Sequence, residues 1–216
     1  MPIILDLNID EDCRLAIWRL EESHEQLKSG LQLKQHELDI INSFKSEKRV
    51  LQWLGTRLLL RTLLNTPEYI DCQLDNFGKP YLTNYNYHIS LSHSYDYAAV
   101  MLSRNPNKKV GVDMEMIKHK IKLVRHKFLS DIELSHKHVG NNINGLYACW
   151  CAKEAIYKWH GKKELEFKRD IRIKPFKLNE QGGQLQAVVQ MKDEKQVLDV
   201  HYFKTDDGYM VGYVIA

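Results

Sequence analysis

The same order of predicted elements occurs twice along the chain, once on each side of a break near its middle. Each side is expected to hold a strand, shorter helical pieces, one long helix and then further strands. The break is Arg104-Asn105-Pro106-Asn107, whose polar residues and proline are typical of a loop. We therefore expect an α+β protein with two similar halves, residues 1–105 and 106–216, related by pseudo-twofold symmetry. Each half should pack a long helix on a small, mostly antiparallel sheet.

The predicted elements can be placed by residue number. Before the break, strands are expected at 12–20, 70–75, 88–92 and 97–102, shorter helices near 23–29 and 34–44, and the long helix at 46–64. After the break, strands are expected at 110–116, 171–178, 184–191, 196–204 and 209–215, and the long helix at about 143–160. Gly182-Gly183 and Asp207-Gly208 are the predicted hairpin turns.

Short motifs mark the ends of the predicted helices. Ser46 is a candidate cap for the first long helix, and Asn65-Thr66-Pro67 ends it. Gly161 ends the second long helix, and Ser130-Asp131-Ile132-Glu133 has the pattern of a capping box. The two long helices also share a spacing, because Trp53, Arg57 and Arg61 recur as Trp150, Glu154 and Lys158. Since such patterns also arise by chance, the shared spacing is weak evidence for a duplicated unit.

Composition and charge exclude several classes of function. No apolar run approaches the roughly 20 residues that cross a bilayer, and Met1–Asp6 has no basic region of the signal-peptide kind. We therefore expect a cytoplasmic protein with no membrane partner. The cysteines, at positions 13, 72, 149 and 151, form no CxxC pair, which argues against a disulfide framework or a structural zinc site. The net charge of +3 is too small to imply nucleic acid as a partner.

One segment is strongly basic within this nearly neutral chain. Lys118–Lys127 contains no acidic residue. Such a run is most often a solvated helix face. The other interpretation is a docking surface for an acidic partner or for phosphates. Charge alone leaves both interpretations open.

Two acidic residues share one side of a predicted strand. In Val110-Gly111-Val112-Asp113-Met114-Glu115, Asp113 and Glu115 are two residues apart and so point to the same side. An apolar strand rarely carries two such acids without a cation to neutralise them, and hard oxygen ligands suit Mg²⁺. The alternative is a solvent-facing end of the strand.

The second candidate segment is Trp150–Lys158 on the second long helix. Glu154 and Lys158 are four residues apart and therefore share a helix face. Taken alone, the pair is best explained as a surface salt bridge. The functional alternative makes Glu154 an acidic ligand or base and Lys158 a phosphate contact. The chain has no GxGxxG, Walker-type, HExxH or GxSxG motif that would indicate other chemistry.

Together the two segments resemble the signature of a known family. Gly-Val-Asp-x-Glu followed by Trp-x-x-Lys-Glu-Ala-x-x-Lys resembles the 4′-phosphopantetheinyl transferases, and the glutamate two residues after the aspartate resembles the Sfp-type members. Phe77–Tyr81 resembles the family's Gly-Lys-Pro turn, and Ile89–Ser94 resembles its Ser-His-Ser strand end. Many Sfp-type members have asparagine where this chain has Ser90, which puts substrate preference in doubt.

The resemblance implies a transferase that moves 4′-phosphopantetheine from coenzyme A to a serine of an apo acyl or peptidyl carrier protein, releasing 3′,5′-ADP. It implies that Asp113, Glu115 and Glu154 hold Mg²⁺ and that Glu154 and Lys158 are catalytic, with Glu154 as the proton acceptor. The residues implied in coenzyme A binding are Arg49, Arg57, Lys79, Pro80, Ser92, His93, Lys153 and Lys158. For Lys153, a structural role within the helix is an equal alternative.

The resemblance also raises expectations about partners and assembly. The basic segment Lys118–Lys127 becomes the expected docking surface for an acidic carrier protein. Two fused halves that meet across a cleft favour a monomer. Two other functions stay open: a non-catalytic module that binds coenzyme A or a carrier protein, and a magnesium-dependent phosphohydrolase that uses the same acids.

Overall fold

The computed structural model describes residues 3–192 and 194–216, and the chain divides into two compact units. The first unit runs to Asp75 and continues over Pro80–Lys108. The second comprises Asn76–Lys79 and Lys109–Ala216, so it includes a short piece that the sequence placed in the first half. Met1 and Pro2, on which the expectation about the amino terminus partly rested, lie outside the described residues.

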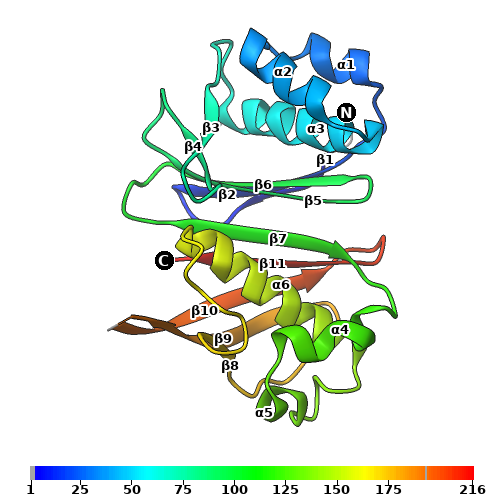
Figure 1. Cartoon of the computed structure of the whole chain (residues 1–216), viewed down its shortest axis with the longest axis vertical. Coiled ribbons are helices and arrows are strands. Elements are labelled where there is room, and N and C mark those ends of the chain that lie inside the picture. The colour runs from blue at the N-terminus through cyan, green and yellow to red at the C-terminus, as the bar shows by residue number, and fades with distance from the viewer. Residues whose placement is uncertain (1–2, 193) are drawn as a thin grey trace. The chain divides into compact units, whose positions relative to one another are not determined.

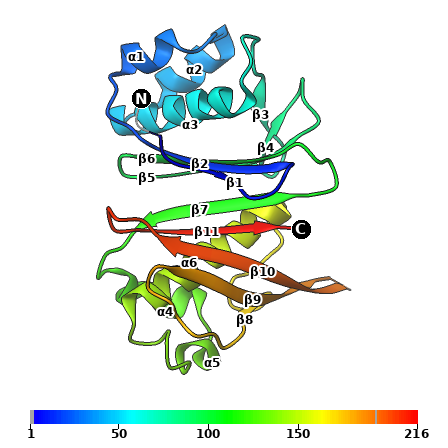
Figure 2. The same ribbon diagram turned by 180° about the vertical axis from the view of Figure 1, so that it is seen from behind.

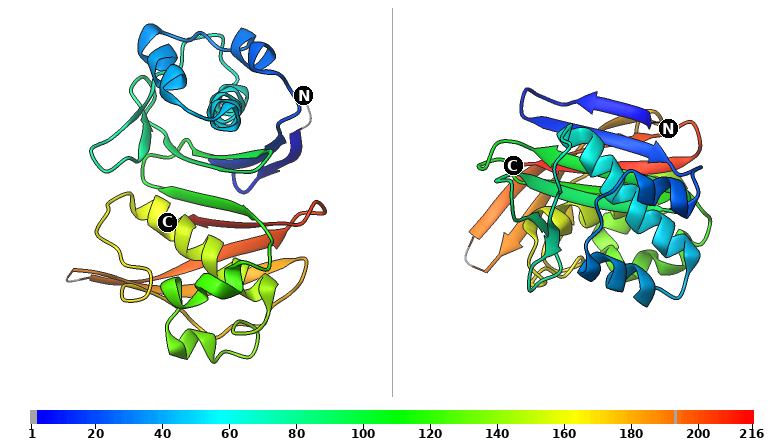
Figure 3. Two further views of the ribbon diagram at one scale, coloured as in Figure 1. Left: turned by 45° about the vertical axis from the view of Figure 1, so that its right-hand side comes forward. Right: turned by 90° about the horizontal axis from the view of Figure 1, so that it is seen from above.

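The first unit is a helical layer on an antiparallel sheet (Figure 1). Its strands are β1 (Ile3–Asn8), β2 (Cys13–Arg19), β3 (Cys72–Leu74), β4 (Pro80–Leu82), β5 (His88–Ser94) and β6 (Tyr97–Ser103). Its helices are α1 (His24–Ser29), α2 (Gln35–Ser43) and α3 (Glu47–Leu64). The main sheet has the order β1-β2-β6-β5, and β3 pairs with β4. Helix α3, seen almost end-on in the left view of Figure 3, packs on β6, β2 and β5 through buried leucines.

The ends of α3 agree with the sequence except for the role of Ser46. Asn65 adopts the left-handed conformation at a φ of 50° and ends the helix as predicted. Ser46 does occupy the N-cap position, but its side chain makes no capping hydrogen bond. The prediction of the position was correct, and the predicted hydrogen bond was wrong.

The second unit is a five-stranded antiparallel sheet with α6 on one face (Figure 2). Its strands are β7 (Val110–Met116), β8 (Ile171–Ile173), β9 (Gly182–Met191), β10 (Glu194–Lys204) and β11 (Tyr209–Ile215). Its helices are α4 (Ile121–Phe128), α5 (Asp131–Leu134) and α6 (Ile143–His160). The strand order is β7-β11-β10-β9-β8, and α6 packs mainly on β7 and β11.

The two units, taken separately, share one feature of topology. In each, a strand leads towards the long helix, and the last strand of the unit returns to pair antiparallel with that strand: β6 with β2, and β11 with β7. The predicted mixed α+β class with antiparallel sheets is confirmed, whereas the pseudo-twofold relation stays a prediction.

Four details of the sequence-based assignment were wrong. Strand β1 was not predicted, although its residues alternate between half-buried and exposed positions. Strand β4 was not predicted either. The strand expected over 171–178 is only Ile171–Ile173. Gly182 and Gly183 are not a turn, because they begin β9 and pair with Phe203 and Tyr202.

Two expected absences concern the whole of the described chain. Over residues 3–192 and 194–216, no helix is both long enough and apolar enough to cross a membrane. All four cysteines are buried free thiols, in agreement with the prediction from their spacing.

Candidate functional site

Helix α6 lies unusually close to the sheet of its own unit because two strand positions are glycines. A Cβ atom at Gly111 of β7 would lie 2.0 Å from the carbonyl oxygen of Ala155, and one at Gly212 of β11 would lie 2.8 Å from the carbonyl carbon of Cys151. No side chain fits in either space. The close approach brings Glu154 and Lys158 of α6 over Asp113 of β7.

Asp113 and Lys158 form an ion pair at this contact. The Lys158 ammonium donates to Asp113 Oδ1 at 2.8 Å, and Asp113 is only 5% exposed. A carboxylate this buried requires a positive partner, which the end of α6 supplies here. The sequence predicted an ion pair of Lys158 with Glu154, its neighbour on the same helix face. In the structure the salt bridge of Lys158 is instead with Asp113.

Glu154 is held in surroundings that disfavour its charge. The pKa of Glu154 is raised from its usual 4.5 to about 7, mainly by burial and then by the negative charges of Asp113 and Glu115, whereas Lys158 acts in the opposite direction. Because Asp113 and Glu115 both act on the pKa of Glu154, the three carboxylates lie near one another. Burial, then the charges of Asp113 and Glu115, also raise the pKa of the Cys151 thiol on the same helix.

The three carboxylates suit Mg²⁺ by their chemistry, although they do not form a closed ligand shell. Carboxylate oxygens are the protein ligands that Mg²⁺ prefers, and it binds through one or two of them together with phosphate and water. Among the residues the structure describes, no three His, Cys, Asp or Glu side chains are placed so that they could hold a metal ion together. The types of donor atom fit the predicted metal, and the predicted ligation of Mg²⁺ by Asp113, Glu115 and Glu154 stays a prediction.

Lys153, the neighbour of Glu154, has no exposed surface and its ammonium is surrounded by oxygen atoms. It donates to the carbonyl oxygens of Phe128, Phe167 and Ile171 at 2.7–2.9 Å, and it lies 2.8 Å from Glu133 Oε1. These contacts use the three N–H donors of an ammonium group. Of the two predicted roles for Lys153, the surroundings favour the structural one over a phosphate contact.

Glu133 is a neighbour of Lys153 that the sequence reasoning missed. The capping box of Ser130 and Glu133 is present as predicted. The same carboxylate also accepts from the backbone N–H of Ile173 at 2.9 Å and pairs with Lys153. In the sequence, the only signal at Glu133 is its position in a capping box. That signal does not reveal its ion pair with Lys153, twenty residues away.

The other residues implied in coenzyme A binding have varied surroundings. The ammonium of Lys79 donates to the carbonyl oxygen of Trp159 at 2.8 Å, close to the end of α6. Pro80 begins β4, and buried Ser92 and exposed His93 lie near the end of β5. Their predicted role in binding coenzyme A stays a prediction.

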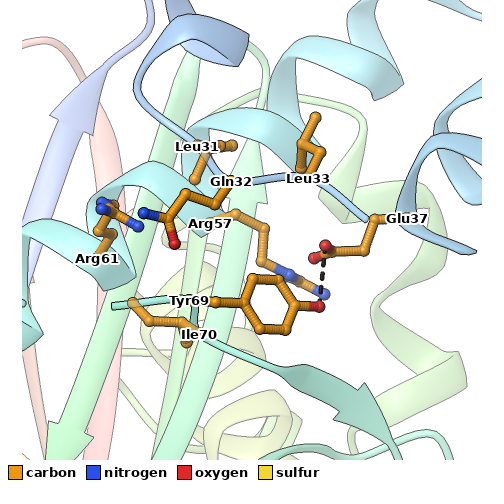
Figure 4. Close-up of a pocket in the computed structure, with 8 residues that line it drawn as sticks. All are labelled: Leu31, Gln32, Leu33, Glu37, Arg57, Arg61, Tyr69 and Ile70. Atoms are coloured by element: carbon orange, nitrogen blue, oxygen red, sulfur yellow. Dashed lines mark hydrogen bonds between the residues drawn. The ribbon is translucent and has the colours of Figure 1, made fainter. Parts of the chain in front are cut away.

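The two arginines of α3 differ from each other. Arg49 is exposed and lies over the ring of Phe44 at 5.0 Å. Arg57 is half-buried, lies over Trp53 at 4.7 Å and lines a small pocket of the first unit (Figure 4). The wall of this pocket includes Glu37, which accepts a hydrogen bond from the Tyr69 hydroxyl at 3.0 Å. The predicted nucleotide contacts of Arg49 and Arg57 both stay predictions.

Helix α4 displays most of the basic segment to solvent. Lys120, Lys122, His126 and Lys127 are exposed, and Leu123 among them is 85% exposed. An exposed leucine between basic side chains offers both apolar and electrostatic contacts. The sequence predicted the basic character of this surface, but it did not predict the apolar contribution.

Comparisons with known proteins bear on the family of this part of the chain. Residues 109–214 match the family model described as the 4′-phosphopantetheinyl transferase superfamily, and this range includes Asp113, Glu115, Glu154 and Lys158. This part of the chain belongs to the 4′-phosphopantetheinyl transferase superfamily. A protein of Haemophilus influenzae, named "Putative 4′-phosphopantetheinyl transferase", is 36% identical over 89 residues. That alignment covers 39% of this chain and 37% of the relative, so the chain matches well under half of the relative's length.

Proposed function

We propose that the protein transfers 4′-phosphopantetheine from coenzyme A to a serine of an acyl or peptidyl carrier protein. The observation that carries the proposal is the grouping of Asp113, Glu115, Glu154 and Lys158 where α6 crosses β7, within the range that matches the superfamily. In the proposed reaction the serine oxygen forms a bond to the β-phosphorus of coenzyme A. The pyrophosphate P–O bond breaks, and 3′,5′-ADP leaves.

Glu154 has the properties of a proton acceptor for the serine hydroxyl. A general base works best when its pKa lies near the operating pH. In the metal-free protein the pKa of Glu154, raised to about 7 by burial and by the neighbouring acids, meets this requirement. Lys158, an ammonium directly beside the acids, would neutralise charge on the phosphate groups during transfer.

Asp113, Glu115 and Glu154 would hold Mg²⁺ together with the pyrophosphate of coenzyme A. When bound, the ion supplies Lewis-acid stabilisation of the phosphoryl group and of the leaving phosphate. The proposed binding of coenzyme A also involves Lys79, Ser92, His93 and Arg49.

The proposed carrier protein docks on α4. The exposed lysines of this helix attract an acidic surface, and Leu123 offers an apolar contact at its centre. Helix α4 follows β7 in the chain, so a carrier held there lies in the same unit as Asp113 and Glu154.

A direct assay tests the reaction. The purified protein is incubated with coenzyme A, Mg²⁺ and a panel of apo carrier proteins, and the intact mass of each carrier is read alongside 3′,5′-ADP release. We expect a mass gain of one phosphopantetheine that is lost in Glu154→Gln and in EDTA, but not in Glu164→Gln. Glu164 is a suitable control because it is an exposed glutamate outside the site.

Two outcomes would contradict the proposal. Release of nucleotide from coenzyme A without any carrier protein would indicate a phosphohydrolase. Binding of coenzyme A without modification of any carrier would favour a non-catalytic binding module.

A further inference from the structure

Helix α4 is attached to α6 at both of its ends and at its middle. The attachments are hydrogen bonds within the second unit, and they involve residues of α6 itself or of the loop that leads into it. Each attachment uses a group whose geometry is fixed by its own helix or loop. Helix α4 also packs Ile121 and Phe128 into the core of the unit, so hydrogen bonds and apolar contacts both hold it.

The N-terminal attachment is made by Tyr147. Its hydroxyl accepts a hydrogen bond from the backbone N–H of Lys118 at 3.1 Å, just before α4 begins. Tyr147 lies on α6 and is 4% exposed, so this hydrogen bond has little competition from solvent. The middle attachment is made by Arg125, which donates to the carbonyl oxygen of Gly140, two residues before the N-cap of α6, at 2.9 Å.

The C-terminal attachment is made by Lys153. Its ammonium donates to the carbonyl oxygen of Phe128, the last residue of α4, at 2.9 Å. A charged donor makes a stronger hydrogen bond than a neutral one, and burial strengthens it further. Glu133 pairs with the same ammonium and gives this buried lysine an acidic partner. Lys153 is directly followed by Glu154, so one turn of α6 both holds α4 and carries the proposed proton acceptor.

We propose that Tyr147 and Lys153 are positioning residues that fix the carrier-docking helix α4 relative to Glu154. This inference rests on the proposed function, since it assumes that a carrier protein docks on α4. A carrier held on α4 presents its serine at a place set by the orientation of that helix. Transfer requires the serine within bonding range of its acceptor, and misplacement by about 1 Å can cost two orders of magnitude in rate. The hydrogen bonds of Tyr147 and Lys153 fix the orientation of α4 before the carrier binds.

The test removes one hydroxyl group and keeps the aromatic ring. Tyr147→Phe deletes the acceptor for the Lys118 N–H and preserves the packing. Tyr157→Phe is the matched control, because Tyr157 lies on the same helix and its hydroxyl makes no hydrogen bond over residues 3–192 and 194–216. Lys153→Met removes the stronger attachment. The Tyr147 variant decides the test if the Lys153 variant does not fold.

Two measurements are made on each variant. The first is amide hydrogen exchange over residues 117–129, which needs neither coenzyme A nor a carrier. The second is kinetics, with the carrier protein and coenzyme A varied separately. Since one neutral hydrogen bond changes an equilibrium about fivefold, we expect Tyr147→Phe to speed exchange at Lys118 about fivefold. We expect kcat/KM for the carrier to fall about as much, with the KM for coenzyme A unchanged and Tyr157→Phe like wild type.

The outcomes separate this inference from the proposed function. If amide exchange over residues 117–129 is the same in Tyr147→Phe, Tyr157→Phe and wild type, Tyr147 does not hold α4. Faster exchange with unchanged carrier kinetics would overturn the positioning role. Weaker coenzyme A binding in Lys153→Met, without faster exchange, would show that Lys153 contacts a phosphate and would refute its role as a positioning residue. If wild type modifies no carrier, the proposed function fails, whereas the exchange data still decide whether Tyr147 holds α4.

Discussion

Replacing Glu154 with glutamine should stabilise the protein at high pH while abolishing transfer. The reason is the site's electrostatics, because burial, Asp113 and Glu115 all disfavour the ionised form of this carboxyl group. In the folded protein the pKa of Glu154 is about 7, compared with an ordinary value of 4.5. Between these two values the unfolded chain has lost the proton and the folded chain retains it. The free energy of unfolding therefore falls as the pH rises through this window.

The size of the effect follows from the same two values. At about 1.36 kcal/mol per pH unit, the difference between 4.5 and about 7 corresponds to an upper limit of about 3.4 kcal/mol. Glu154 keeps some contact with solvent, which weakens the electrostatic penalty. We therefore expect about 1–2 kcal/mol between about pH 5 and about pH 8. Glutamine resembles the protonated acid, so the free energy of unfolding of Glu154→Gln does not fall over this pH range.

Urea unfolding in EDTA at several pH values measures the difference directly. We expect the two proteins to be nearly equal at about pH 5 and the variant to be more stable by about 1–2 kcal/mol at about pH 8. Glu164→Gln, which changes an exposed acid, should follow wild type at every pH. A variant that is less stable than wild type at high pH, or a difference that does not change with pH, would refute the reasoning about crowded carboxylates.

Three further predictions follow from other parts of the structure. The double change Lys120→Glu and Lys122→Glu should raise the KM for the carrier about fivefold at low salt, by the usual contribution of exposed charges. Coenzyme A binding, measured by calorimetry, should stay nearly intact. If carrier binding in steady-state kinetics and coenzyme A binding weaken equally, the carrier does not dock on α4. Gly212→Ala should lower the free energy of unfolding, measured in urea, by about 2–3 kcal/mol, because the added Cβ meets the backbone of α6 at 2.8 Å. An unchanged free energy of unfolding would mean that α6 shifts freely. Adding Mg²⁺ at about pH 8 should raise the melting temperature of wild type more than that of Glu154→Gln, and equal shifts would show that Glu154 does not contribute to metal binding.

The sequence predicted the elements that carry the site with particular accuracy. The bounds of β7 and of α6 agree with their predicted ranges, and Gly161 ends α6 in the left-handed conformation at a φ of 75°. These elements have strong local signals, namely an apolar strand and a long helical pattern followed by glycine. The two-residue spacing of Asp113 and Glu115 then fixed their shared side of the strand.

Interactions between distant parts of the chain could not be predicted in the same way. The salt bridge of Lys158 with Asp113 joins residues 45 positions apart, and the Lys153–Glu133 pair depends on how α5 and β8 fold around α6. Lys153 looks like any helical lysine in the sequence, yet it has no exposed surface. Strand β1 has only a short alternating pattern at the edge of its sheet, which offers little signal in a single sequence.

The glycine at position 111 offers a way to read other sequences. Many chains contain an Asp-x-Glu pair and a distant Lys-Glu helix by coincidence, and those motifs alone cannot show whether the helix reaches the strand. A residue with any side chain two positions before the aspartate would hold the helix away, since here a Cβ would lie 2.0 Å from the Ala155 oxygen. Among candidate relatives, a bulky residue at that position therefore marks chains that have the motifs but cannot assemble the site.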